Sequence, residues 1–464
     1  MQSLATVPRC SRLMVADRLR SICLNMVLEG GLGVMSERRL SRRDFLRASM
    51  AAGTAAAIST MPAGLSYAQE QAFLNYWTGW SGFEFDVLQG LVDQFNEERE
   101  NIYVNMTTVF GQYEKVLTAI AGGNPPDIVS AVWLHQLVQI ASQGALTPLT
   151  AYAEAAGIDG SEYFPQLWEN WWYNGELWGL MCTSNARVLA FSPPAMAELG
   201  VSEPPTSIDE LDEVSQAFEI IDGAGNIERV GLLPANLTWW AHVFGGSLYD
   251  EDNGTITAND PANVAALEWM AGYWERLGPE KVAAFTSGFG DYLSTQNPFF
   301  VGKEGFKQVG EWFIQFQKKF APDLEMDMIA APYPDGGREN CTTFGGSVFT
   351  IPTGVINPDA AWEFIRWLSE DEHMGEFCFN IQNIPPKVGA ATAERFVSDH
   401  RFQLALDLLN GPNAFGPAKI PVNDFYNSRL GEAETSVKAG MLGAQEALDR
   451  VTEEVQRELD MAMM

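Results

Sequence analysis

The sequence has few of the residues on which most catalytic and metal sites depend. It holds four histidines and five cysteines in 464 residues. No CxxC pair, HExxH motif or other metal-ligand spacing occurs among them. P-loop, GxSxG and strand-linked GxGxxG motifs are also absent. Many Asp and Glu are present, but no pattern singles out a catalytic pair.

Basic residues and long apolar runs are scarce as well. There are 29 Lys and Arg against 60 Asp and Glu, which gives a formal charge of −31. This balance argues against nucleic acid and anionic membranes as partners. No stretch of about 20 strongly apolar residues occurs, so we expect no membrane-spanning helix. The hydrophobic content of 46% suits a globular protein, and the length predicts two lobes.

The N-terminal region has the pattern of an export signal. Residues 41–47 read SRRDFLR, a twin-arginine pattern, and an Ala-rich stretch follows. Ser66-Tyr67-Ala68 offers small residues for a signal peptidase, so we predict cleavage after Ala68. Residues 1–68 would then be a twin-arginine signal peptide with an upstream extension, and the mature protein would be soluble in a periplasm.

The chain after the signal alternates strand and helix patterns. A strand at 73–77 is followed by an amphipathic helix at 84–97, and a strand at 102–106 by a helix from Tyr113. A third strand begins at Asp127. This β-α-β-α-β order predicts an α/β fold with a parallel sheet. Ligands bind beyond the carboxyl ends of such strands, where the third strand delivers Trp133 and His135. Asp127, at the start of that strand, is the less favoured ligand contact.

Aromatic residues beside turns are the other candidates for binding. Tryptophan faces stack on the apolar faces of sugar rings, while short polar groups bind the hydroxyls. The candidates are Trp80, Tyr113, Trp133, Trp239, Trp240 and Trp312. For Trp80, Trp239, Trp240 and Trp312, a place in the core is an equally good interpretation.

Eight segments together resemble the extracellular solute-binding proteins of carbohydrate ABC importers, the group that includes the maltose-binding protein. They extend over essentially the whole chain from Phe73 onward. They are 76–82 (YWTGWSG), 95–97 (FNE), 113–129 (YEKVLTAIAGGNPPDIV), 143–149 (QGALTPL), 174–180 (NGELWGL), 244–248 (FGGSL), 344–354 (FGGSVFTIPTG) and 360–372 (AAWEFIRWLSEDE).

The resemblance implies the two-lobed, type II-like fold of periplasmic binding proteins, with a ligand cleft between lobes joined by a hinge. Lobe one would comprise 69–182 and 345–400, and lobe two 187–340 and 401–464. The residues implied to bind ligand are Trp80, Ser81, Glu84, Tyr113, Asp127, Trp133, His135, Asn185, Trp239, Trp240, Trp312, Gly345 and Gly346.

The implied function is the capture of a sugar or sugar derivative and its delivery to the permease of an ABC transporter. We expect a monomer without cofactor, metal or covalent chemistry. Two alternatives stay open. The same fold could bind a non-sugar such as glycerol phosphate, a polyamine or an iron complex. A secreted glycoside hydrolase would need two carboxyl groups about 5–10 Å apart in the cleft.

The cysteines suggest one more hypothesis. The family usually has proline where Met181-Cys182 stands here. Cys182 and Cys341 lie where the two segments that cross between the lobes are expected to run side by side. A disulfide between them would cross the hinge, and two buried free thiols are the alternative.

Overall fold

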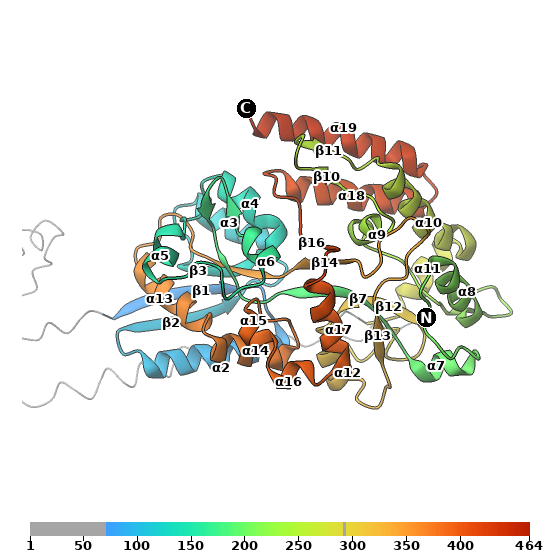
Figure 1. Ribbon diagram of the computed structural model, residues 1–464, viewed down its shortest axis with the longest axis horizontal. Helices are drawn as coiled ribbons and strands as arrows, with labels where there is room; N and C mark the ends of the chain where they lie inside the picture. The colour runs from blue at the N-terminus through green and yellow to red at the C-terminus, as the bar shows by residue number, and fades with distance from the viewer. Residues whose placement is uncertain (1–70, 291–293) are drawn as a thin grey trace, which may run out of the picture. The chain divides into compact units, whose positions relative to one another are not determined.

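The computed structural model describes residues 71–290 and 294–464 (Figure 1). The predicted export signal, with its cleavage after Ala68, lies outside the described residues. Among the helices that the structure describes, none is long and apolar enough to cross a membrane.

The first five-stranded sheet is built around the predicted parallel strands. Its order is β2 (Ile102–Thr108), β1 (Ala72–Thr78), β3 (Ile128–Trp133), β15 (Ser347–Thr350) and β6 (Leu180–Met181). Strand β1 is parallel to β2 and β3, and β15 is antiparallel to β3 and β6. The predicted β-α-β-α-β order is confirmed, because two helices connect the parallel strands.

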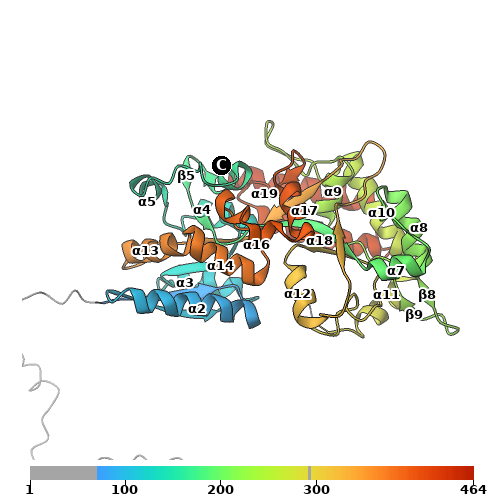
Figure 2. The ribbon, with the colours of Figure 1, turned by 60° about the horizontal axis from the view of Figure 1, so that its bottom comes forward.

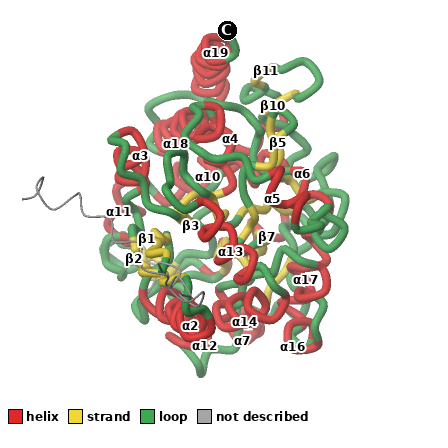
Figure 3. Tube along the Cα trace, turned by 90° about the vertical axis from the view of Figure 1, so that its left-hand side faces the viewer, coloured by secondary structure: helices red, strands yellow, loops and turns green. Residues whose placement is uncertain are grey.

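Helices surround this first sheet. They are α2 (Gly82–Glu98), α3 (Tyr113–Ala121), α4 (Leu134–Ser142), α5 (Thr150–Ala155), α6 (Pro165–Glu169), α13 (Pro358–Leu368), α14 (Asp371–Ile381), α15 (Val388–Ala391) and α16 (Glu394–Val397). Helices α2 and α14 contact each other and lie below β1 and β2 in Figure 3. Helix α2 forms because Leu88, Leu91 and Phe95 recur at helical spacing and are buried.

The second five-stranded sheet lies farther along the chain. Its order is β12 (Phe306–Gly310), β7 (Asn185–Phe191), β14 (Thr342–Gly345) and β16 (Ala414–Phe415), and β13 (Asp327–Ile329) also pairs with β7. Three short hairpins complete the described strands: β4 (Trp172–Tyr173) with β5 (Glu176–Leu177), β8 (Ile220–Ile221) with β9 (Ile227–Arg229), and β10 (Tyr249–Asp250) with β11 (Thr255–Ile256).

The remaining helices accompany the second sheet. They are α7 (Pro193–Glu198), α8 (Ile208–Phe218), α9 (Leu237–Val243), α10 (Pro261–Leu277), α11 (Pro279–Thr286), α12 (Phe313–Phe320), α17 (His400–Leu409), α18 (Asn423–Lys438) and α19 (Ala444–Ala462). Helices α18 and α19 pack side by side, at the top of Figure 1. Helices α8, α10 and α11 gather at the right of Figure 2.

The chain passes between the two sheets along paired backbone. Strand β7 follows β6, and β14 leads into β15, as the two extended segments predicted. Gly345 pairs with Asn185 at the edge of the second sheet, and two residues later Ser347 pairs with Trp133 in the first. Gly346, between them, has φ +152°, and a Cβ atom there would overlap the carbonyl oxygen of Thr183. Only glycine fits this position.

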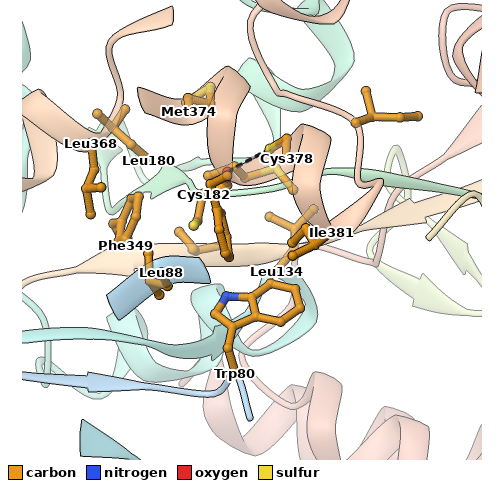
Figure 4. Packing of buried hydrophobic residues seen from close by; sticks show 14 of the residues in the cluster. Trp80, Leu88, Leu134, Leu180, Cys182, Phe349, Leu368, Met374, Cys378 and Ile381 are labelled. Carbon is orange, nitrogen blue, oxygen red and sulfur yellow. Dashed lines mark hydrogen bonds between the residues drawn. The ribbon is translucent and has the colours of Figure 1, made fainter. Parts of the chain in front are cut away.

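The three described cysteines are free thiols, so the prediction of a disulfide between Cys182 and Cys341 is wrong. The physical reason is that each is packed in a different apolar cluster. Cys182 lies with Trp80, Leu134 and Cys378 in the core of the first sheet (Figure 4). Cys341 belongs to the cluster around α9, α10 and α18. The Cys378 thiol instead donates to the carbonyl oxygen of Cys182, at 3.6 Å.

We expect a reducing agent to leave the unfolding temperature of the mature protein unchanged. Alkylation in denaturant without reductant should label Cys182, Cys341 and Cys378 completely, because none of these thiols is paired. Mass spectrometry of the labelled peptides measures this. A pair of cysteines that reacts only after reduction would contradict the packing described here.

Candidate functional site

A cavity of about 910 Å³ is lined by residues of both sheets and of their helices. Its lining is rich in aromatic residues: Trp80, Phe110, Trp133, Tyr249, Trp312, Phe344, Phe415 and Tyr426. Its ionisable residues are Glu84, His135, Arg187, His242, Glu251 and Glu434, besides the tyrosines already named. Aromatic surfaces with a few polar groups are typical of sites for organic ligands.

The first wall is formed where β1 and β3 end. The rings of Trp80 and Trp133 meet edge to face, with centroids 5.6 Å apart. The loop after β1 is fixed because the hydroxyl of Thr108 donates to the carbonyl oxygen of Trp80, at 2.6 Å. Parallel strands end at the same edge of a sheet, so the two tryptophans are brought together by the topology.

Glu84 adds a buried carboxyl group to this wall. It lies in the first turn of α2 and is 8% exposed. None of the described residues donates a hydrogen bond to it or pairs with it as an ion. Burial raises the pKa of Glu84 to about 7. The cavity therefore contains a carboxyl group that none of the described residues hydrogen-bonds.

The second wall comes from the turn between β12 and α12. The guanidinium carbon of Arg187 lies 5.0 Å from the ring centre of Trp312. A Cβ atom on Gly310 would overlap the Trp312 ring, so the glycine provides the space that the ring occupies. The Trp312 ring thus lies against the backbone at Gly310 and near the guanidinium group of Arg187.

The far end of the cavity is made by the C-terminal part of the chain. The rings of His242 and Phe415 stack with centroids 4.2 Å apart and an interplanar angle of 3°. Tyr426 donates to the carbonyl oxygen of Leu248, at 2.6 Å. The amide of Asn423 donates to the carbonyl oxygen of His135, at 2.7 Å, so α18 contacts α4 beside the cavity.

Eight of the thirteen predicted site residues line this cavity. They are Trp80, Glu84, Trp133, His135, Asn185, Trp312, Gly345 and Gly346. Ser81, Tyr113 and Asp127 are not among the lining residues. Asp127 instead accepts a hydrogen bond from the backbone N–H of Asn75, at 2.8 Å, and so joins β1 to the start of β3. The roles of Ser81, Tyr113 and Asp127 in ligand binding stay predictions.

Trp239 and Trp240 do not line the cavity, and the structure corrects the expectation that they contact ligand. Both are fully buried in the core of α9. The indole N–H of Trp239 donates to the carbonyl oxygen of Cys341, at 3.1 Å, and that of Trp240 to Gln308 Oε1, at 3.0 Å. Because both rings are buried and both indole N–H groups are hydrogen-bonded, these residues stabilise the fold.

The sequence did not indicate Asn383, Phe415, Asn423 or Tyr426, which also line the cavity. These residues stand in no motif that we recognised, and they are brought to the cavity only by tertiary packing. The strand β16 is two residues long, too short to leave a periodic signal. A scan for aromatic residues next to glycine would have found Phe415.

Residues 84–375 match the sequence model of the family described as bacterial extracellular solute-binding protein. A maltotriose-binding protein from Pyrococcus abyssi is 23% identical over 67% of this chain and 65% of its own length. A probable ABC transporter-binding protein from Deinococcus radiodurans is 25% identical over 55% and 61%. The chain thus matches a little less than two thirds of the length of these two relatives.

Solved structures show the same fold. CpMnBP1 with mannobiose bound has a TM-score of 0.77 and 25% identity, with 83% of this chain and 100% of that chain covered. An ABC substrate-binding protein from Listeria monocytogenes in complex with cycloalternan has a TM-score of 0.72 and 19% identity, with 84% and 100% covered. The predicted two-lobed α/β fold is therefore confirmed, while the lobe boundaries stay a prediction.

The buried carboxyl group of Glu84 makes the stability of the ligand-free protein depend on pH. Its pKa is 4.5 in the unfolded chain and about 7 in the folded one. Stability is therefore lost as the pH rises through 7, by up to about 3 kcal/mol. We expect Glu84→Gln to raise the free energy of unfolding by up to that amount at pH 8 and by little at pH 4.5.

Urea unfolding at the two pH values measures this difference. Glu97→Gln is the matched control, because Glu97 is exposed on the same helix and should give little change at either pH. An equal effect of Glu84→Gln at both pH values would show that the carboxyl group ionises without cost.

Proposed function

This chain belongs to the family of bacterial extracellular solute-binding proteins, and we propose that it binds a sugar or sugar derivative in the cavity and delivers it to the permease of an ABC importer. The observation that carries the proposal is the aromatic lining contributed by both sheets. Trp80 and Trp133 come from the first sheet, and Trp312 lies beside the second. Sugar rings present apolar faces to such surfaces and hydroxyl groups to the polar residues between them.

The binding mechanism follows from this bilateral lining. A ligand that contacts both walls gains its full interaction only when the walls approach each other, so it shifts the population toward a closed form. The permease would recognise that closed form. The protein performs no covalent chemistry in this scheme. Its residues bind, orient and release.

The charges of the cavity support a neutral or cationic ligand. Arg187 is the one arginine or lysine among the lining residues that the structure describes, and it packs against Trp312. Three glutamates also line the cavity. A phosphate ligand needs several cationic donors, so a sugar without phosphate fits this lining better than glycerol phosphate does.

The twin-arginine pattern at residues 41–47 supports export to a periplasm. The proposal therefore includes a mature protein that starts after Ala68, acts as a monomer, and collects its ligand outside the cytoplasm. The division into lobes at 69–182 with 345–400, and 187–340 with 401–464, is part of the same proposal.

A thermal-shift screen of the mature protein against neutral mono- and oligosaccharides tests the function. A ligand at 100 times its Kd should stabilise the protein by about 2.7 kcal/mol and so raise the unfolding temperature. Glycerol phosphate and a polyamine belong in the panel. A shift with one of these and with no sugar would refute sugar binding. Release of product from an oligosaccharide would instead indicate a glycoside hydrolase and refute a role without covalent chemistry.

For a sugar found in this screen, we expect Trp312→Ala to raise Kd at least tenfold, because the ring offers a stacking surface to the cavity. Calorimetry measures the change. Trp77→Ala is the control, since Trp77 packs near Lys115 and does not line the cavity. An unchanged Kd in folded Trp312→Ala would remove Trp312 from the site.

A further inference from the structure

Glu311 is a fully buried carboxyl group at the junction of the two sheets. It stands between β12 and α12, and its exposed fraction is 0%. Its Oε2 accepts a hydrogen bond from the backbone N–H of Ala186, at 2.9 Å. Its Oε1 accepts one from the backbone N–H of Ile384, at 3.2 Å. One side chain thus connects three segments that are far apart in the sequence.

Each of these three segments contributes a neighbouring residue to the cavity. Asn185 precedes Ala186, Asn383 precedes Ile384, and Trp312 follows Glu311, and all three line the cavity. Glu311 itself is not among the lining residues. Its bonds therefore act one residue behind the ligand-facing surface, on the backbone that carries it.

Backbone pairing around Glu311 also connects the neighbouring segments. Ser184 and Ile384 exchange hydrogen bonds, with N–H to oxygen pairs at 2.7 and 3.0 Å. Ala186 pairs with Phe344 of β14. One of the segments fixed by Glu311, the one that contains Ala186, is therefore a segment through which the chain passes from the first sheet to the second.

Burying a carboxyl group at this position costs free energy. Burial raises the pKa of Glu311 to about 8, against the opposing effect of the two backbone N–H donors and of Arg187. An apolar side chain would avoid this cost, but it would remove the side-chain acceptor of the Ala186 N–H and one of the two acceptors of the Ile384 N–H, which also donates to Ser184. The hydrogen bonds are what the glutamate contributes.

We propose that Glu311 is a positioning residue for the ligand cavity, which holds Asn185, Asn383 and Trp312 in one arrangement by bonding the backbone beside them. The proposal rests on the proposed function, because it assigns the cavity to the ligand. It makes the affinity for that ligand depend on a side chain that does not touch it.

The test compares Glu311→Ala and Glu311→Gln in the mature protein, with a sugar that the unaltered protein binds. We expect Glu311→Ala to raise Kd at least tenfold. Glu311→Gln retains one acceptor oxygen and should recover part of the lost affinity. Trp312→Ala should cost less affinity in the Glu311→Ala background than alone, because Trp312 is already displaced there.

Gln317→Ala is the matched control for a loss of buried polar contacts, on α12, the helix that follows Glu311. Gln317 is 7% exposed, and its amide donates to the carbonyl oxygens of Ala321 and Leu324, at 3.1 and 3.0 Å. It does not line the cavity. We expect this variant to lose stability and to keep its Kd.

Hydrogen–deuterium exchange of the ligand-free proteins gives a readout that needs no sugar. Peptides that contain Ala186 and Ile384 should exchange faster in both Glu311 variants than in the unaltered protein or in Gln317→Ala. If the unaltered protein binds no sugar, the proposed function fails and exchange alone decides whether Glu311 holds these segments. A folded Glu311→Gln or Glu311→Ala with unchanged exchange and unchanged Kd would overturn the proposal, and so would fully additive costs with Trp312→Ala.

Discussion

The backbone pairing between β7 and β14 is the constraint on which the rest of the structure depends. It places Asn185 beside Gly345 in the second sheet, and the next residues deliver Ser347 to Trp133 in the first. The N–H of Cys182 also donates to the carbonyl oxygen of Ser347, at 2.8 Å. The two chain segments that cross between the sheets are hydrogen-bonded to each other, and both walls of the cavity continue from them. A small rotation of these segments therefore changes the distance between the walls.

The sequence predicted the parts of the site that depend on strand order. Trp133 and Trp80 follow buried strands whose β-branched and alternating residues were recognisable, so their place at one edge followed from topology. The family resemblance implied Asn185, Gly345 and Gly346 on the crossing segments. Trp80 and Trp133 line the cavity, as expected where local pattern and tertiary position are directly linked in an α/β sheet.

Predictions that rested on residue type alone were less successful. Trp239 and Trp240 stand after a polar turn, which was compatible with a surface position. Asn236, with φ +63°, instead caps a short helix that turns both rings into the core. Phe415 and Tyr426 reach the cavity from the C-terminal segments, and no local pattern encodes that packing. The predicted disulfide between Cys182 and Cys341 was wrong for the same reason. Two residues on neighbouring strands need not have side chains that point toward each other.

The carboxyl groups of Glu84 and Glu311 show two uses of the same chemistry. Glu84 has no hydrogen-bond donor among the residues that the structure describes and faces the cavity, whereas Glu311 has two backbone donors and lies behind it. Burial raises the pKa of both. In one case the carboxyl group faces the cavity, and in the other it bonds the backbone of two segments that are far apart in the sequence.

The free thiols have a consequence for where the protein can fold. Cys182, Cys341 and Cys378 are buried and form no disulfide with one another. The described fold therefore needs no oxidising compartment and no disulfide isomerase. The fold can therefore form in either a reducing or an oxidising compartment.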